Sequence, residues 1–248
     1  MSDYTREHGV TFILDNGERK HTYNDFGIYP QEKGLPDPPN VRTESIAVPG
    51  MDGTLDVSQA LDGLVHYEDR EFEQIYLVVG PEFRWHHMYS SLVNAIHGRH
   101  VRLVFDDDPE WYYDGRMSVG KPEADMAKYI RIPIKGTLKP YKYSNYTSID
   151  GWDWDPLDFE SGVARDYKDI EIDGTTTVTV LGSVMPVVPV LTVESVDGDG
   201  MTCVYDGVSY HLSDGDNRIP AMSIQAGEIA IVFTGHGTVS IDFREGSL

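Results

Sequence analysis

The chain has 248 residues, enough for one large domain or two ordinary ones, and 40% of them are hydrophobic, which predicts a folded core rather than a disordered chain. The net charge of −21 argues against binding to nucleic-acid phosphates or to an anionic membrane surface, since both need a basic face. The single cysteine, Cys203, excludes an intrachain disulfide and a cysteine-based zinc site.

The first 80 residues read as strands joined by turns and one proline-rich segment. Asn16-Gly17 between two strand-like stretches predicts a hairpin in which both central residues have positive φ. The segment from Pro30 to Asn40 is expected to be an exposed loop, or an arm lying on a neighbouring molecule, because proline cannot donate to a strand ladder. Residues 42–48 and 70–80 are expected to be strands.

The stretch Val48–Gly53, VPGMDG, has the glycine spacing of a phosphate-binding turn but lacks its other features. A P-loop needs Gly-Lys-Ser/Thr, and a dinucleotide turn needs a third glycine that opens a helix; neither follows here. We therefore interpret this stretch as a structural turn and a candidate subunit interface, whose glycines supply positive φ or a close backbone approach. The residues of this predicted turn are Pro49, Gly50, Asp52 and Gly53.

One helix is predicted, over residues 81–99, with Pro81 at its first position and Gly98 ending it. Its apolar residues recur at helical spacing and are expected to pack on a sheet. These residues are Trp85, Met88, Leu92 and Ile96. A strand, an acidic turn and a return strand are expected to follow. Beyond them, Ile130, Ile132 and Ile134 alternate with charged residues, as in a half-exposed strand.

The rest of the chain, from residue 143, is expected to be a second domain and carries −14 of the net charge of −21. Its composition break is followed by seven short alternating stretches with Gly or Asp-Gly at each joint. This spacing predicts a β-sandwich or barrel of about seven or eight strands. Alternation places Cys203 on the same face as Met201 and Tyr205, which indicates a buried core thiol.

No pattern in the sequence has the spacing of a catalytic, cofactor or metal site. Asp106, Asp107 and Asp108 are adjacent, whereas a calcium loop needs alternate ligands, so we expect a solvated turn. The histidines lack the spacing of a zinc site, and the Gly-x-Ser-x-Gly elbow of serine hydrolases is absent from the sequence. We therefore expect that the chain is not an enzyme and needs no cofactor.

Carbohydrate binding by the second domain is the alternative that stays open, since many β-sandwiches bind sugars. All four tryptophans lie before the strands of this domain, so other side chains would have to form the contact. The candidate sugar contacts are Tyr205, Tyr210, His211, Asn217 and Arg218.

The order of the parts resembles that of the distal tail (Dit) proteins of long-tailed bacteriophages. A strand is followed by VPGMDG, REFEQIYLVV, the helix, RLVFDDDPEWYYDGRM and IPIKGTLKPYKY, and the chain ends in GEIAIVFTGHGTVSIDFREGSL. The pair Pro140-Tyr141 matches the one that closes the first domain in this family. The resemblance covers nearly the whole chain, and its specificity lies in the order and spacing of short motifs.

The resemblance implies a mainly β fold with two domains. Residues 1–142 would be a β-sandwich with one packed α-helix that forms a hexameric ring, and residues 143–248 a galectin-like β-sandwich. The galectin-like fold does not imply sugar binding here, because the sugar site of galectins normally includes a tryptophan and no tryptophan follows residue 154.

The implied function is that of a baseplate hub in the virion tail, assembled in the host cytoplasm. The ring would join the tail tube to the tip. Its implied neighbours are the tube protein, the tape measure protein and a tail-tip, lysin or receptor-binding protein. DNA would pass through an acidic ring without being bound, and no membrane partner is expected.

Overall fold

The computed structural model describes residues 9–32, 34–78, 85–125, 129–150, 167–196 and 198–248, which form two compact units. The first unit comprises residues up to Lys142 together with Leu248, and the second comprises Tyr143–Ser247. The fold is mainly β, as predicted, with two helices among the described residues. No helix in these ranges has the length and apolarity needed to cross a lipid bilayer.

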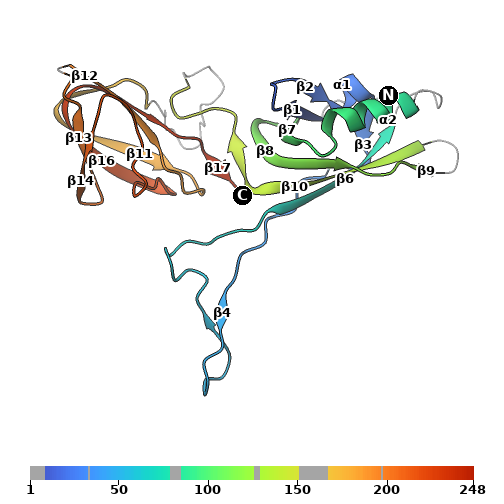
Figure 1. Ribbon diagram of the computed structural model, residues 1–248, viewed down its shortest axis with the longest axis horizontal. Coiled ribbons are helices and arrows are strands. Elements are labelled where there is room, and N and C mark those ends of the chain that lie inside the picture. Colours follow the sequence, from blue (N-terminus) through green and yellow to red (C-terminus); the bar gives the residue numbers. More distant parts are fainter. Residues whose placement is uncertain (1–8, 33, 79–84, 126–128, 151–166, 197) are drawn as a thin grey trace. The chain divides into compact units, whose positions relative to one another are not determined.

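The first unit is built on a nine-stranded sheet with the strand order β2-β1-β7-β8-β10-β6-β3, and β9 and β17 pair with β10. Figure 1 shows its helices on one side of the sheet. The strands of this sheet are β1 (Val10–Leu14), β2 (Arg19–His21), β3 (Ile28–Pro30), β6 (Arg70–Val78), β7 (His100–Phe105), β8 (Asp108–Val119), β9 (Glu123–Asp125), β10 (Tyr129–Ser144) and β17 (Gly246–Ser247). The last two residues of β10 and the whole of β17 belong to the second unit.

Side chains alternate between the two faces of these strands, and those on one face form a single apolar core. In β10, Ile132 and Ile134 are fully buried, while Arg131 and Lys135 lie on the opposite face, as the alternating pattern predicted. Lys135 pairs across the strands with Glu73 of β6 at 2.9 Å. The first sheet is therefore apolar on the side of the helices and polar on the other.

The predicted helix is α2 (Trp85–Ile96), which buries Leu92 and Ile96 and packs Met88 against the same core. Gly98 follows its end with φ of +71°, as expected of a helix stop. The predicted start at Pro81 lies outside the described residues.

A second, short helix, α1 (Thr22–Phe26), was not predicted. Five residues are too few to show an apolar period, and the helix depends instead on its caps. The His21 side chain accepts hydrogen bonds from the backbone N–H groups of Tyr23 and Asn24, and Gly27 ends the helix with φ of +64°.

The predicted hairpin at Asn16-Gly17 forms between β1 and β2, but its geometry differs from the expected one. Only Gly17 has positive φ, at +80°, whereas Asn16 keeps a negative φ. The Gly17 N–H donates to the Leu14 carbonyl at 2.8 Å, which is a type I turn followed by a left-handed glycine. This loop is longer than the predicted two-residue turn, so Asn16 does not need a positive φ.

The second unit is a curled six-stranded sheet with the order β14-β13-β16-β12-β15, and β11 pairs with the other side of β16. Its strands are β11 (Ile170–Gly182), β12 (Val190–Ser195), β13 (Met201–Tyr205), β14 (Val208–Leu212), β15 (Gly215–Asn217) and β16 (Gly227–Asp242). The face inside the curl forms a separate apolar core that includes Cys203, with no exposed surface, and Met201.

Two of the predicted glycine joints in this unit are not turns, so the expected count of seven or eight strands is wrong for the described residues. Gly174 and Gly235 face each other within one continuous pair, β11 and β16, and both have positive φ. Glycines in such conformations bend and twist a strand without ending it. Two long, kinked strands therefore replace four short ones.

Candidate functional site

Residues 41–67 form an exposed arm between β3 and β6, which we call the arm (Figure 1). It is a long irregular hairpin with a bridge between Val41 and Tyr67 at its root and a two-stranded ladder further out. The ladder joins β4 (Ser45–Ile46) to β5 (Leu55–Asp56). The strand predicted over residues 42–48 is thus reduced to two residues. The proline-rich segment that was predicted as an arm, Pro30 to Asn40, precedes this arm and runs beside β6, where the Asp37 N–H donates to the Glu71 carbonyl at 3.3 Å and Pro36 is buried.

The arm carries apolar side chains that stay largely exposed in the described chain. None of its residues is buried, and Leu61 is 94% exposed. The arm holds seven of the fifteen large apolar side chains that are exposed in the described residues, so it is an apolar surface and not a solvated loop. The seven are Val41, Ile46, Val48, Met51, Leu55, Leu61 and Val65.

The VPGMDG stretch lies at the far end of the arm, in the loop between β4 and β5. The Met51 N–H donates to the Val48 carbonyl at 3.1 Å, which closes the turn. Gly50 and Gly53 have φ of +85° and +82°, and a Cβ on either would meet nothing within 4 Å. Of the two roles expected for the glycines, positive φ therefore applies and close backbone approach does not. Pro49 and Asp52 are exposed beside them.

The root of the arm is fixed to the first sheet by aromatic and cationic side chains. The ring of Tyr67 meets that of Tyr141 edge-on, with centroids 5.8 Å apart. Arg70, only 3% exposed, donates to the Pro140 carbonyl and stacks over Tyr113, with 5.3 Å from its guanidinium carbon to the ring centroid. Burial lowers the pKa of Arg70. Pro140-Tyr141, singled out by the resemblance, thus holds the arm in place.

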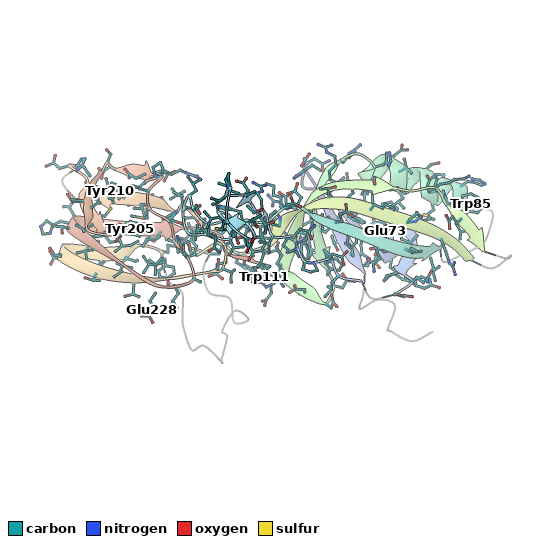
Figure 2. All side chains as sticks on the ribbon, turned by 90° about the horizontal axis from the view of Figure 1, so that it is seen from below. Glu73, Trp85, Trp111, Tyr205, Tyr210 and Glu228 are labelled. Carbon is teal, nitrogen blue, oxygen red and sulfur yellow. The ribbon has the colours of Figure 1, made fainter. Side chains whose placement is uncertain are left out.

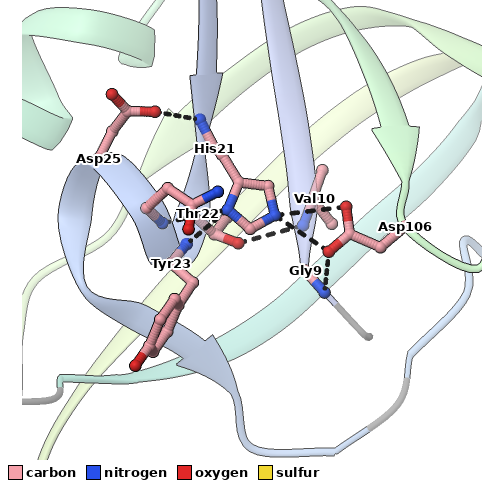
Figure 3. Close-up of polar contacts among 8 residues, drawn as sticks. Gly9, Val10, His21, Thr22, Tyr23, Asp25 and Asp106 are labelled. Carbon is pink, nitrogen blue, oxygen red and sulfur yellow. Dashed lines mark hydrogen bonds and ion pairs between the residues drawn. The ribbon is translucent and has the colours of Figure 1, made fainter. Parts of the chain in front are cut away.

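The first of the three adjacent aspartates, Asp106, has a structural role that the expected solvated turn does not describe (Figure 3). Its carboxylate accepts from the Gly9 N–H at 3.0 Å and from His21 Nε2 at 3.0 Å. His21 Nδ1 faces the N–H groups of Tyr23 and Asn24, so Nδ1 is the acceptor and Nε2 carries the proton. The acidic turn therefore fixes the histidine that caps α1.

Replacing Asp106 with Ala is expected to destabilise the first unit by about 2 kcal/mol, because two donors lose a charged acceptor. Glu110→Ala, which removes an exposed carboxylate of β8, is the matched control and should change stability by less than about 0.5 kcal/mol. Thermal unfolding followed by calorimetry measures both. Equal effects of the two substitutions would contradict the role assigned to Asp106.

The other aspartates of the turn do not gather into a cation site. Asp108 pairs with Lys142 at 2.7 Å, and Lys142 also lies 5.0 Å from the ring centroid of Trp111. Across the described ranges, no group of three or more His, Cys, Asp or Glu side chains is placed to hold a metal ion.

Cys203 is a core thiol, as alternation predicted, and is not placed to act as a nucleophile. Burial raises its pKa to about 11, so the thiol stays protonated at neutral pH. Its neighbours belong to the apolar core of the second unit.

The candidate sugar contacts are not brought together on one face. Tyr210 pairs with Cys203 across the strands and so lies on the core side, whereas His211 projects from the other face. The Tyr205 hydroxyl donates to the Ser223 carbonyl at 2.8 Å, and Tyr205 and Tyr210 both pack against the core (Figure 2).

Asn217 and Arg218 lie in the turn around β15. The Asn217 amide donates to the carbonyls of Leu191, Ser213 and Gly215, so its polar atoms already shape the turn, while Arg218 is exposed. Sugar contact by these residues stays a prediction.

The features that sequence reasoning missed are the apolar surface of the arm and its anchor at Arg70. Part of the arm, residues 42–48, was predicted as a strand, so its exposed apolar residues looked like ordinary strand positions. Composition gave no signal either, since Gly and Pro make up 4 of the 27 arm residues, which is the same share as their 38 of 248 in the whole chain.

No protein-family model and no curated protein matches the chain. Among solved structures, the chain is similar to the crystal structure of the SPP1 Dit protein (gp 19.1), described as a paradigm of the hub adsorption apparatus in phages that infect Gram-positive bacteria. The likeness covers 97% of this chain and 99% of that one, with a TM-score of 0.60 and 13% sequence identity. The fold that the resemblance to distal tail proteins predicted is thereby confirmed.

Proposed function

We propose that the chain is a structural component of a phage tail tip, a hub whose copies form a hexameric ring between the tail tube and the receptor-binding apparatus. The observation that carries the proposal is the likeness in fold, over 97% of the chain, to a solved phage hub protein. In this role the protein resides in the virion tail after assembly in the host cytoplasm. Residues 1–142 form the ring, and the galectin-like second domain lies on its outside.

The arm supports self-assembly on physical grounds. A two-stranded hairpin is marginal by itself in water, and exposed apolar side chains gain stability once another surface covers them. Covering one such side chain contributes about 1–2 kcal/mol. In the proposed ring, each copy lays its arm, with the VPGMDG turn, on the neighbouring copy.

The partners of the hub follow from its place in the tail. The tube protein and the tape measure protein contact one side of the ring, and a tail-tip, lysin or receptor-binding protein contacts the other. DNA passes through without being held, which suits a chain of net charge −21, since acidic walls do not bind phosphates. We also propose, as part of the same role, that the chain is a structural protein and not an enzyme.

Native mass measurement of the purified chain tests the ring. We expect a species six times the 27.9 kDa of one chain. The double substitution Ile46→Ser with Leu61→Ser should dissociate it and leave each chain folded, because both side chains are exposed within one chain. Val196→Ser, at a 76% exposed valine of the second unit, is the matched control and should leave the ring intact.

Two outcomes count against the proposal. A chain that stays single at about 100 μM contradicts ring formation, and one that also binds a glycan array supports the carbohydrate-binding alternative. Dissociation by Val196→Ser as readily as by the arm variant contradicts the role of the arm.

A further inference from the structure

The outer edge of β14 is open in the second unit. β14 pairs with β13 on one side, and in the described part of the chain no backbone group bonds to its other side. An open strand edge presents N–H and C=O groups to which another extended chain can add. Figure 1 shows β14 at the margin of the unit.

The register of the hairpin identifies the groups that face outward. Asp206 and Gly207 both have positive φ, +49° and +74°, which is a two-residue type I′ turn between Tyr205 and Val208. Residues that flank such a turn exchange hydrogen bonds, and bonding alternates along the pair. The backbone groups of Ser209 and His211 therefore point away from β13.

Open edges in natural proteins usually carry protective features, and β14 has none of them. Its five residues, VSYHL, include no proline, lysine or carboxylate, and its pairing with β13 has no bulge. The other long free edge of this sheet, β11, is protected by Glu171, Asp173 and the kink at Gly174. β15 has only three residues, one of them Asp216. Among these edges, β14 is the one suited to pairing.

The side chains of β14 favour an incoming strand with apolar residues at alternate positions. Val208, Tyr210 and Leu212 project to the core side, where Val208 is 50% exposed and Tyr210 is partly buried. An added strand would place its own apolar residues opposite these three and extend the core. Ser209 and His211 on the other face would meet polar residues.

Both ends of β14 are acidic, which selects the charge of the partner. Asp206 precedes the strand and Asp214 follows it, while Asp199 lies in the loop before β13 and Asp216 in β15; all four are exposed. Hydrogen bonds from Ser195 hold the pKa of Asp214 below its usual range, so this carboxylate is ionised.

Two occupants conflict with this charge. A second copy pairing antiparallel through β14 would set Asp206 against the other copy's Asp214. The arm of another copy carries four carboxylates and one arginine. Like charges at both ends disfavour each of them.

We propose that β14 binds an extended segment of another protein as an added strand. The segment alternates apolar and polar residues over about five positions and has Lys or Arg at each end. Backbone bonds to Ser209 and His211 supply the pairing, and the acidic ends supply the charge preference. The inference does not depend on the ring.

A direct test uses the full chain and a fluorescent peptide, Lys-Val-Thr-Val-Thr-Val-Lys, with Glu replacing both Lys in a second peptide. We expect saturable binding of the Lys peptide alone, with affinity that falls as salt rises. Hydrogen exchange followed by mass spectrometry should show protection confined to residues 208–212. Equal binding of both peptides, or protection elsewhere, would overturn the proposal.

Variants locate the contacts. Ser209→Pro removes an outward N–H and should abolish binding; continued protection of Cys203 from thiol reagents shows that the unit is still folded. Asp206→Asn, which tolerates the left-handed conformation, should weaken binding about two- to fivefold. Asp173→Asn removes an exposed carboxylate from β11 and should have no effect.

Two variant results contradict the proposal. Undiminished binding by a folded Ser209→Pro variant sinks it. The chain could instead fail to bind the peptide and self-associate, with the association lost in Ser209→Pro. That result would identify a second copy as the partner of β14.

Discussion

Excision of residues 42–66, with Val41 joined to Tyr67 through Asn-Gly, is expected to leave a folded chain that no longer assembles. Val41 and Tyr67 form an antiparallel bridge, so a two-residue turn can connect them. No residue of the arm is buried, and the root contact of Tyr67 with Tyr141 remains, so the first unit keeps its core. The excision removes six of the seven exposed apolar side chains of the arm, all but Val41, and with them the proposed contact between copies.

Light scattering and calorimetry check this expectation together. The species of high mass should disappear, while the unfolding midpoint of the first unit moves by no more than a few degrees. If the variant with the Asn-Gly linker still assembles, the copies associate through another surface. Loss of the folded signal would show that the arm contributes to the core.

Gly237→Ala is expected to unfold the second unit selectively. Gly237 has φ of +143°, and a Cβ there would overlap the carbonyl oxygen of Glu194 and lie 2.8 Å from the Cα of Ser195. Backbone strain and overpacking together should cost on the order of 3–6 kcal/mol. The position matters because β16 passes from β13 to β12 at this point, and the curl of the sheet depends on that passage.

Gly227→Ala is the matched control, since Gly227 also has positive φ, at +109°, but open space around it. It should cost only the conformational strain, about 1–3 kcal/mol. Cys203, the single thiol, reports on the second unit: it is fully buried and should react with a thiol reagent quickly in Gly237→Ala and slowly in the control. Equal reactivity in the two variants would count against the close approach as the cause.

The proposed contact between copies and the proposed strand addition at β14 use different surfaces. The arm belongs to the first unit and presents apolar side chains, whereas β14 belongs to the second and presents backbone groups between acidic ends. Self-assembly and attachment of a basic partner can therefore be disrupted separately, by Ile46→Ser with Leu61→Ser and by Ser209→Pro.

The sequence by itself determined the features that depend on neighbouring residues. Alternation placed Ile132 and Ile134 in the core and made Cys203 a buried thiol, because side chains on a strand alternate between its faces. The period of α2 and its stop at Gly98 were equally visible, since a helix repeats every 3.6 residues. The order of the motifs also led to the fold of the distal tail proteins, although no short motif identified it.

Only the tertiary structure decided the features that depend on distant residues. Gly174 and Gly235 bend their strands and do not end them, because they face each other in one strand pair. They are 61 positions apart in the sequence, so local spacing does not reveal this pairing. Asp106 hydrogen-bonds His21 because the sheet brings the two residues together, and His21 in turn caps α1. The arm is exposed because no other part of the described chain buries any of its residues. In a sequence, apolar residues look the same whether their partner is within the chain or in another molecule.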